Sequence, residues 1–472
     1  MFLLKWGMEM FVGREKELRI LENLYQKEAF EFVVVYGRRR VGKTSLLNEF
    51  IKDKRAVFYS CLDSNEKQNL ELFSNAVVTA VTGAEARFSF HSYQDAMDYV
   101  LEQSLKERLI LVIDEYPYLA NCYPGISSLL AAMIDHKFLQ SKLMLILCGS
   151  SLSFMENQVL GYQSPLYGRR TAQMKLLPFQ FAECGEYYRN FDKQELALAY
   201  GVSGGIPLYM SKINDQKSMK ENIKNNFFEV SAYLYEEPEN LIKQECREPM
   251  QYNAIIRSIA TGSSKISEIA GTSGIGDNST VSNYISKLLS LGIIEKEYPY
   301  KTASTKKTIY KLADSMFQFW YRFVPSNRSL IERGAAERVY QKIEEQIPAY
   351  MGFVFEEICK QYLWKENLNG SAPVEFTDMG RWWGTDKTTK SQTEIDIIAD
   401  NEQDEAIFAE CKWRNEDVGW AELKGLQHKS TLFHYRRKVL MLFSKTGFSE
   451  ACIELAKELG EVYLIKYEDM KF

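Results

Sequence analysis

A lysine and a threonine that follow a glycine-rich loop form the most specific chemical pattern in the sequence. Gly37-Arg-Arg-Arg-Val-Gly42-Lys43-Thr44 matches the phosphate-binding loop G-x-x-x-x-G-K-[ST], and a valine run at residues 33–35 precedes it. Such a loop wraps backbone N–H groups around phosphates, and the helix expected from about Lys43 directs its positive dipole end at the same anion. A chance glycine turn before a helix is the alternative, but both flanks have the required pattern. The loop predicts binding of a nucleoside triphosphate, with Lys43 on the β- and γ-phosphates and Thr44 on Mg²⁺.

Two carboxylates end the apolar run at residues 109–113. A buried parallel strand delivers its C-terminal residues to the phosphate edge of a sheet. Asp114 is therefore expected to complete the Mg²⁺ shell with Thr44, and Glu115 to polarise the attacking water. This pairing favours ATP hydrolysis over a P-loop kinase, which would need an acceptor hydroxyl instead of a water molecule.

Small polar and cationic residues flank two further strands of the same region. Ser150 follows the apolar run 143–148, and its hydroxyl is expected either to sense the γ-phosphate or to belong to an N-cap for the next helix. Arg169 and Arg170 precede another strand. They are either surface charge or a source of positive charge for the transition state of a neighbouring subunit or domain.

The residues 12–15, Val-Gly-Arg-Glu, lie shortly upstream of the loop. They are either an ordinary helix start or a segment beside the adenine. The complete set predicted to contact the nucleotide is Gly13, Arg14, Gly37, Arg38, Arg39, Arg40, Val41, Gly42, Lys43, Thr44, Ser45, Asp114 and Ser150.

A second group of charged residues lies near the C-terminus. Residues 393–399 and 406–413 are predicted to form a hairpin whose period-two alternation separates Asp396, Glu410 and Lys412 from the apolar positions. Asp396 and Glu410 are expected to chelate Mg²⁺, which needs hard oxygen ligands, and Lys412 to orient or deprotonate a water. Glu356, on an earlier amphipathic helix, is the expected additional metal ligand. The alternative is an exposed hairpin face with alternating charges.

The elements that must position these residues predict an α/β fold in four parts. Residues 1–178 are expected to form a P-loop core with a parallel sheet, and residues 179–240 a helical lid with a turn at Gly204-Gly205-Ile206-Pro207. Residues 241–330 are predicted to form a winged helix-turn-helix, and residues 331–472 a further α/β domain.

The predicted winged helix consists of three helices (255–260, 265–270 and 280–291) and a hairpin (292–298 and 307–312). Its local lysine excess would suit DNA phosphates, and Ser282, Asn283 and Lys287 are the residues expected to face a groove. The alternative is a structural joint or a protein-docking module. The six lysines are Lys287, Lys296, Lys301, Lys306, Lys307 and Lys311, against Glu295 and Glu297.

Composition excludes several other classes of protein. The chain has 472 residues and a formal charge of -5, so any nucleic-acid site must be local. Its eight cysteines are scattered without a C-x-x-C pair, and its four histidines lack ligand spacing, so buried thiols in a reducing compartment are expected instead of disulfides or zinc. We expect no membrane span and no signal peptide, a biological start at Met8 or Met10, and a cytoplasmic location.

The motifs VGRE, GRRRVGKTSLL, LVIDEYPYL, CGSS, YGRRT and GGIP resemble the archaeal-type AAA ATPases of the STAND-related clade. This resemblance covers about half of the chain and implies a P-loop ATPase with a helical lid. GRWWG, EIDIIA and AECKW resemble the C-terminal domain that usually follows this ATPase type, which is similar to the restriction-endonuclease fold of PD-(D/E)xK nucleases. The sequence departs from the nuclease pattern at Ile395, where that pattern has proline.

Two hypotheses follow. The first is an enzyme that hydrolyses ATP with Mg²⁺, binds DNA and cleaves it at a second Mg²⁺ site. The second is a nucleotide-dependent switch or scaffold whose C-terminal domain binds a partner without chemistry. A second copy of the chain or another protein is the expected partner in that case.

Overall fold

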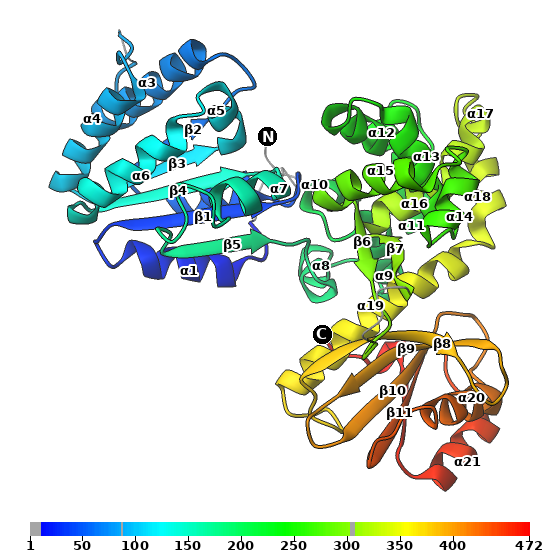
Figure 1. Cartoon of the computed structure of the whole chain (residues 1–472). Coiled ribbons are helices and arrows are strands. Elements are labelled where there is room, and N and C mark those ends of the chain that lie inside the picture. The colour runs from blue at the N-terminus through cyan, green and yellow to red at the C-terminus, as the bar shows by residue number, and fades with distance from the viewer. Residues whose placement is uncertain (1–10, 86–87, 303–306) are drawn as a thin grey trace. The chain divides into compact units, whose positions relative to one another are not determined.

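The computed structural model describes residues 11–85, 88–302 and 307–472 (Figure 1). The proposed start sites Met8 and Met10 and the predicted phosphate-facing Lys306 lie outside these residues. The chain forms two compact units. The first contains residues up to 178 with 206–211 and 290–292, and the second contains 179–205, 212–289 and 293–472.

The first unit is built on a parallel sheet with strand order β2-β3-β4-β1-β5. All residues of β1, β3 and β4 are buried, which explains why their sequences are continuous apolar runs instead of alternating ones. The strands are β1 Glu31–Gly37, β2 Ala56–Ser60, β3 Leu109–Asp114, β4 Leu143–Gly149 and β5 Ala172–Leu176.

Helices cover both faces of this sheet (Figure 1). Phe32 and Val34 of β1 pack in the core beneath α3 to α6, whereas Val33 and Val35 pack against α1 and α2, as alternation along a strand requires. The helices are α1 Glu15–Tyr25, α2 Lys43–Ile51, α3 Glu66–Thr82, α4 Tyr93–Lys106, α5 Tyr116–Cys122, α6 Ile126–His136, α7 Leu152–Phe154 and α10 Pro207–Met210.

The second unit begins with helices and one short hairpin, β6 Ile294–Glu297 with β7 Ile309–Leu312, which pair antiparallel. Gly204 and Gly205 form the predicted turn after α9, with φ of 62° and 65°. A side chain at Gly205 would come within 2.1 Å of the Phe179 carbonyl oxygen. The helices are α8 Phe181–Tyr187, α9 Lys193–Ser203, α11 Met219–Phe227, α12 Tyr233–Glu245, α13 Pro249–Ala260, α14 Ile266–Ser273, α15 Asn278–Ser290, α16 Ser315–Phe323, α17 Arg328–Ile331, α18 Ala336–Glu344 and α19 Ile347–Leu368.

The C-terminal part of the second unit is a mixed sheet with strand order β12-β11-β10-β9-β8. Strands β10, β11 and β12 are parallel, and β9 is antiparallel to both of its neighbours. Helices α20 and α21 share a core with one face. The elements are β8 Asp378–Thr385, β9 Gln392–Asp400, β10 Glu405–Lys412, α20 Trp420–Ser430, β11 Arg437–Ser444, α21 Glu450–Leu459 and β12 Val462–Lys466. Within the described residues, each helix is too short or too polar to cross a membrane.

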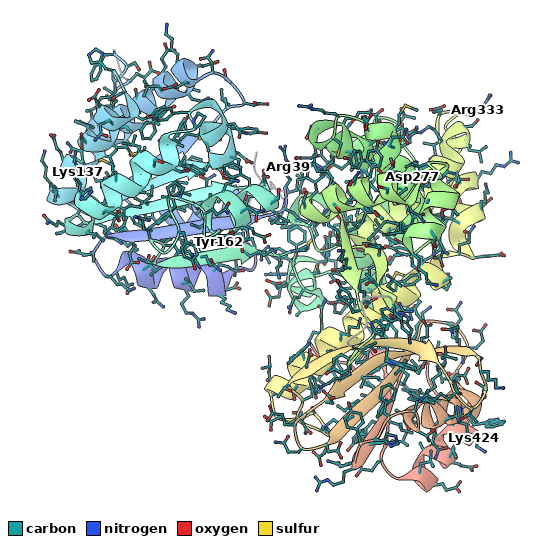
Figure 2. All side chains as sticks on the ribbon, in the orientation of Figure 1. Arg39, Lys137, Tyr162, Asp277, Arg333 and Lys424 are labelled. Atoms are coloured by element: carbon teal, nitrogen blue, oxygen red, sulfur yellow. The ribbon has the colours of Figure 1, made fainter. Side chains whose placement is uncertain are left out.

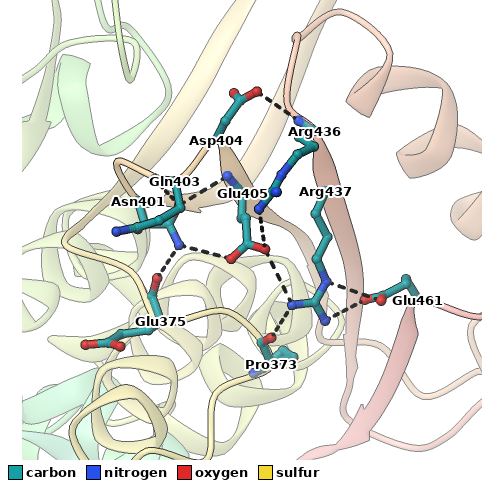
Figure 3. A network of polar contacts seen from close by, with 9 residues as sticks. All are labelled: Pro373, Glu375, Asn401, Gln403, Asp404, Glu405, Arg436, Arg437 and Glu461. Carbon is teal, nitrogen blue, oxygen red and sulfur yellow. Dashed lines mark hydrogen bonds and ion pairs between the residues drawn. The ribbon is translucent and has the colours of Figure 1, made fainter.

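Polar contacts tie together the amino ends of the parallel strands in this sheet (Figure 3). Arg437, the first residue of β11, donates to both carboxylate oxygens of Glu461 at 3.2 and 3.0 Å and to the Pro373 carbonyl at 3.2 Å. Asn401 in the β9–β10 turn accepts a hydrogen bond from the Glu405 amide at 3.1 Å. The network therefore fixes the end of the sheet at which β10 and β11 begin.

The loop after β6 is part of the core of the C-terminal sheet. Tyr300 is 8% exposed, its hydroxyl donates to Asp400 Oδ1 at 2.7 Å, and its amide donates to the Arg381 carbonyl at 2.8 Å. Gly380 has no space for a side chain because the Tyr300 ring lies 2.6 Å from the position of its Cβ. The Lys301 ammonium lies 3.2 Å from Asp400 Oδ2. The β6–β7 hairpin is thus anchored to the C-terminal sheet.

Replacing this anchor should destabilise the second unit. Tyr300→Ala removes a buried ring, so we expect a loss of about 3–5 kcal/mol in unfolding free energy. Tyr300→Phe removes only the hydrogen bond to Asp400 and should cost about 1–2 kcal/mol. Urea unfolding followed by tryptophan fluorescence would measure both. Tyr298→Ala is the control, because Tyr298 is 46% exposed on the same loop; an equal effect of Tyr298→Ala and Tyr300→Ala would contradict the anchor.

Candidate active sites

The phosphate-loop residues form a tight turn between β1 and α2. Leu176 of β5 lies so close to Gly37 that a Cβ there would come within 2.4 Å of its carbonyl oxygen, and Gly42 has a φ of 89°. Helix α2 begins at Lys43. The Lys43 ammonium donates to the carbonyl oxygens of Gly37 and Arg38, both at 2.9 Å, and the residue is 6% exposed. Burial lowers the pKa of Lys43, while the nearby Cys148, Glu115 and Asp114 act in the opposite direction.

Asp114 lies beside this loop. Strands β1 and β3 are separated by β4 in the sheet, but all three are parallel and end at the same edge. The Thr44 hydroxyl donates to Asp114 Oδ2 at 2.8 Å, and Oδ1 accepts the backbone amide of Glu115 at 2.9 Å. A hydroxyl and a carboxylate are hard oxygen donors that suit Mg²⁺. The structure therefore brings together the residues that were predicted to hold the nucleotide and its metal.

Ser150 and Glu115 are also in contact. The Ser150 hydroxyl donates to Glu115 Oε2 at 2.9 Å. The helix that follows is not capped by a side chain at Ser151, so the helix-cap alternative has no support in these contacts. Glu115 has a φ of 50°, an uncommon conformation for a residue with a side chain. In this backbone conformation the Glu115 carboxylate points to Ser150, which follows the end of the neighbouring strand β4.

The arginines around the loop have several different partners. Arg39 donates to the Tyr118 hydroxyl at 3.0 Å, and Arg40 donates to the hydroxyl of Tyr209 in α10 at 3.4 Å. Arg14, which follows Gly13, is 6% exposed and donates to the carbonyl oxygens of Val41 at 3.2 Å and Leu177 at 2.6 Å. Its guanidinium group thus braces the loop backbone. Sequence reasoning placed Arg14 near the adenine and did not predict this role.

Arg169 lies at the opposite edge of the sheet. Thr171, two residues later, donates its amide to the Phe32 carbonyl at the beginning of β1. Arg169 pairs with both oxygens of Asp135 at 2.8 and 2.7 Å, and Arg170 is the next residue. Arg169 therefore does not reach the phosphate loop of its own chain. Action of Arg169 or Arg170 across a subunit boundary stays a prediction.

The C-terminal carboxylates are buried at the point where β9 and β10 separate. Asp396 and Glu410 are each 5% exposed, so they do not lie on an exposed hairpin face, and that alternative was wrong. The regular pairing of the two strands ends at Ile397 and Ala409. Beyond it, Asp396 Oδ2 accepts the Cys411 amide at 2.9 Å. Burial, followed by the charge of Glu410, raises the pKa of Asp396 to about 6.

Two lysines hold the Glu410 carboxylate. Lys412 donates to Oε2 at 2.5 Å and lies 3.8 Å from Asp396 Oδ2, while Lys429 donates to Oε1 at 2.6 Å. Burial raises the pKa of Glu410, but the two ammonium groups outweigh it and lower this pKa overall. Lys429 was missed by sequence reasoning. It lies in the last turn of α20, and its sequence context does not distinguish it from a helix-terminal surface lysine.

Glu356 approaches from α19. The rings of Phe355 in α19 and Trp413, which follows β10, lie 5.1 Å apart, so alternation along the chain directs Glu410 and Lys412 towards the other face. Burial, followed by the charge of Asp396, raises the pKa of Glu356 to about 7. Across the described residues, three acidic, histidine or cysteine side chains are nowhere grouped as a ready metal cage. The predicted ligand set Glu356, Asp396 and Glu410 is therefore not assembled as one cluster.

Two parts of the chain match known domain families. Residues 11–213 match an ATPase domain found predominantly in Archaea. Residues 320–425 match DUF234, a family of archaeal and bacterial proteins of unknown function.

Protein MJECL04 of Methanocaldococcus jannaschii is 32% identical to this chain over 412 residues, which cover 86% of this chain and 88% of that protein. The chain belongs to the MJECL04 family. The ATP-binding protein MJ0423 of the same organism is 42% identical over 50 residues, 11% of this chain and 85% of that protein. The Walker-type ATPase PABY2304 of Pyrococcus abyssi superposes with a TM-score of 0.52 at 20% identity, over 66% of this chain and 96% of its own. It shares the fold with this member of the MJECL04 family.

The burial of Asp396 predicts a pH-dependent stability. Its pKa of about 6 exceeds the ordinary value of 3.8, so the folded state binds more protons than the unfolded state between these values. Stability is consequently lost as the pH rises through about 6. Asparagine at this position carries no charge, so Asp396→Asn avoids this loss. We expect its unfolding free energy to exceed that of the wild type by about 1–3 kcal/mol at about pH 8 and to differ little at about pH 4.

Urea unfolding at both pH values would measure this difference. Glu402→Gln is the control, since Glu402 is exposed in the β9–β10 turn. A stability difference for Asp396→Asn that is the same at both pH values would contradict the raised pKa.

Proposed function

We propose that this protein is an ATP hydrolase that couples its nucleotide state to a DNA-binding segment and to a Mg²⁺-dependent nuclease site. The hydrogen bond of 2.8 Å between Thr44 and Asp114, beside the buried Lys43, is the observation that carries the ATPase proposal. This hydrogen bond joins the phosphate loop to Asp114, the carboxylate at the end of β3 that a phosphate loop needs for its metal. The match of residues 11–213 to an ATPase domain supports it.

In the proposed ATPase mechanism, the phosphates lie in the loop formed by residues 37–44. Lys43 exchanges its contacts with the carbonyls of Gly37 and Arg38 for phosphate oxygens. Thr44 and Asp114 would hold Mg²⁺, which would supply positive charge beside the phosphates. Glu115 accepts a proton from the attacking water, and Ser150, which is in contact with Glu115, holds that carboxylate in place.

Lys43→Ala should lower ATP turnover at least about a hundredfold, because it removes the cation that stabilises the transferred phosphate. Glu115→Gln should abolish turnover while ATP binding persists. Phosphate release and binding of a fluorescent ATP analogue would separate these effects. Lys52→Ala is the control, since Lys52 is exposed at the end of α2. Normal turnover in Lys43→Ala would refute the assignment of the phosphate loop.

The DNA-binding segment of the proposal is the group α13 to α15 with the β6–β7 hairpin, arranged as a winged helix. The exposed side chains of α15 include Asn283, Ser286 and Lys287, and its sequence from Asn278 to Ser290 contains no carboxylate. A polar helix face of this kind suits the major groove, while Ser282 is only partly exposed.

The hairpin contributes less positive charge than the sequence suggested. Lys311 lies 3.2 Å from carboxylate oxygens of both Glu295 and Glu297. Lys301 is paired with Asp400, and the loop that carries it is anchored by Tyr300. The proposal therefore assigns DNA contact to α15 and an intramolecular joint to this part of the hairpin.

The nuclease site of the proposal comprises Asp396, Glu410 and Lys412. The two carboxylates are an all-oxygen donor set that fits Mg²⁺, while Glu356 lies on α19 and is not grouped with them. The metal would supply Lewis acidity at the scissile phosphate. Glu410 and Asp396 raise the pKa of Lys412 in spite of its burial, so this lysine stays charged, orients the water and stabilises the pentavalent phosphate.

Asp396→Ala and Lys412→Ala should each lower Mg²⁺-dependent DNA cleavage at least about a hundredfold without changing ATP turnover. Gel assays with single- and double-stranded DNA and RNA would test this, with Mn²⁺ as a second metal. Glu416→Ala is the control, since Glu416 is exposed in the loop after β10. Cleavage that survives in Asp396→Ala would show that the activity arises elsewhere.

The second candidate is a nucleotide-dependent scaffold. The two ammonium groups on Glu410 favour it, because they neutralise the carboxylate without a metal. A lack of cleavage on all substrates with both metals, together with normal ATP turnover, would support the scaffold.

A further inference from the structure

Glu410 is held on both of its oxygens by lysine. Lys412 occupies Oε2 at 2.5 Å, and Lys429 occupies Oε1 at 2.6 Å. Asp396 lies 3.8 Å from the Lys412 ammonium. The two negative charges of Asp396 and Glu410 equal the two positive charges of Lys412 and Lys429, so these four side chains have no net formal charge.

A divalent metal on Asp396 and Glu410 would disturb this balance. The ammonium groups are bound to the carboxylate oxygens that a metal would need as ligands. They also carry the same sign of charge as the metal, and this repulsion is stronger in a partly buried site than in water. One ammonium must therefore move when a metal enters, unless an anion enters with it.

The two lysines differ in their freedom to move. Lys412 belongs to a central strand and lies between two carboxylates, so it retains a partner when Glu410 is engaged. Lys429 lies in the last turn of α20, and Glu410 is its carboxylate partner there. Its side chain is 24% exposed, so a rotation would carry the ammonium group towards solvent.

We propose that Lys429 is the resident counter-cation of this site. It competes with the divalent metal for Glu410, and once displaced it binds the phosphate diester of the nucleic acid. This inference rests on the nuclease function proposed above. Metal and phosphate binding are then cooperative. The metal frees the Lys429 ammonium from Glu410, and the phosphate gives that ammonium group a new partner.

Titration of the full chain with Mn²⁺ without nucleotide, followed by electron paramagnetic resonance of free Mn²⁺, would test this. Binding that is lost in Asp396→Asn belongs to this site. We expect Lys429→Met to bind Mn²⁺ about tenfold more tightly than the wild type, equivalent to about 1.4 kcal/mol. Lys429→Arg, which keeps the charge, should resemble the wild type. A short DNA duplex should tighten Mn²⁺ binding in the wild type and much less in Lys429→Met.

Lys424→Met is the matched control. Lys424 lies on the same helix, is exposed, and stacks on Trp420 at 5.2 Å from the ring centroid (Figure 2). Thermal melts would show whether Lys429→Met is folded, with Lys429→Gln as a second variant.

Unchanged or weaker Mn²⁺ binding in folded Lys429→Met would overturn the inference and leave Lys429 as a link between α20 and β10. Asp396-dependent binding with the expected pattern, but without cleavage of any nucleic acid, would overturn the nuclease proposal alone. If the wild type and Lys429→Met both lack Asp396-dependent binding, both proposals fail. If DNA does not tighten binding in the wild type, the phosphate part is wrong.

Discussion

Buried charged side chains impose the constraint on which both candidate sites depend. A buried charge is costly unless a partner compensates for its lost hydration. In the first unit, Lys43 is satisfied by two backbone carbonyls and Asp114 by the Thr44 hydroxyl. In the second unit, Asp396 accepts a backbone amide and Glu410 two ammonium groups. These contacts hold the Lys43, Asp114, Asp396 and Glu410 side chains in fixed positions without any bound ligand.

Helix α19 unites the helical and the mixed-sheet parts of the second unit. The Tyr350 hydroxyl lies 2.8 Å from the carbonyl oxygens of both Gly201 in α9 and Ser315 in α16, which share its one proton as acceptors. One turn and a half further along, Glu356 experiences the charge of Asp396. A shift of α9 would therefore displace the element that carries Glu356, because the intervening contacts are buried and directional.

The parts of each site that lie close together in the sequence could be predicted, but their burial by other elements could not. The phosphate loop was predictable because its strand, turn and helix are contiguous, and Asp114 was predictable because parallel strands end at one edge. Asp396, Glu410 and Lys412 lie on adjacent antiparallel strands, so their proximity also follows from a short hairpin. The burial of both carboxylates did not follow, because alternation alone cannot show that a second layer covers the polar face.

Contacts between distant segments escaped prediction for a common reason. Arg14 reaches Val41 and Leu177, and Lys429 reaches Glu410 from another element, so no sequence spacing relates the partners. Tyr300 was expected only as part of a hairpin loop, yet it lies in a core whose other buried residues fall between Ile395 and Ala456. A lysine or tyrosine in a loop has the same local pattern whether it faces solvent or a buried carboxylate.

The turn at Gly204-Gly205 lies where the chain passes between its two units. The chain passes from the second unit to the first between Gly205 and Ile206, and α10, which follows, contacts the phosphate loop through Tyr209 and Arg40. Gly205 is held by Phe179, whose amide donates to its carbonyl at 2.7 Å, and has no space for a side chain. Because α9 also contacts α19, the turn belongs to the packed part of the second unit up to the residue at which the chain enters the first.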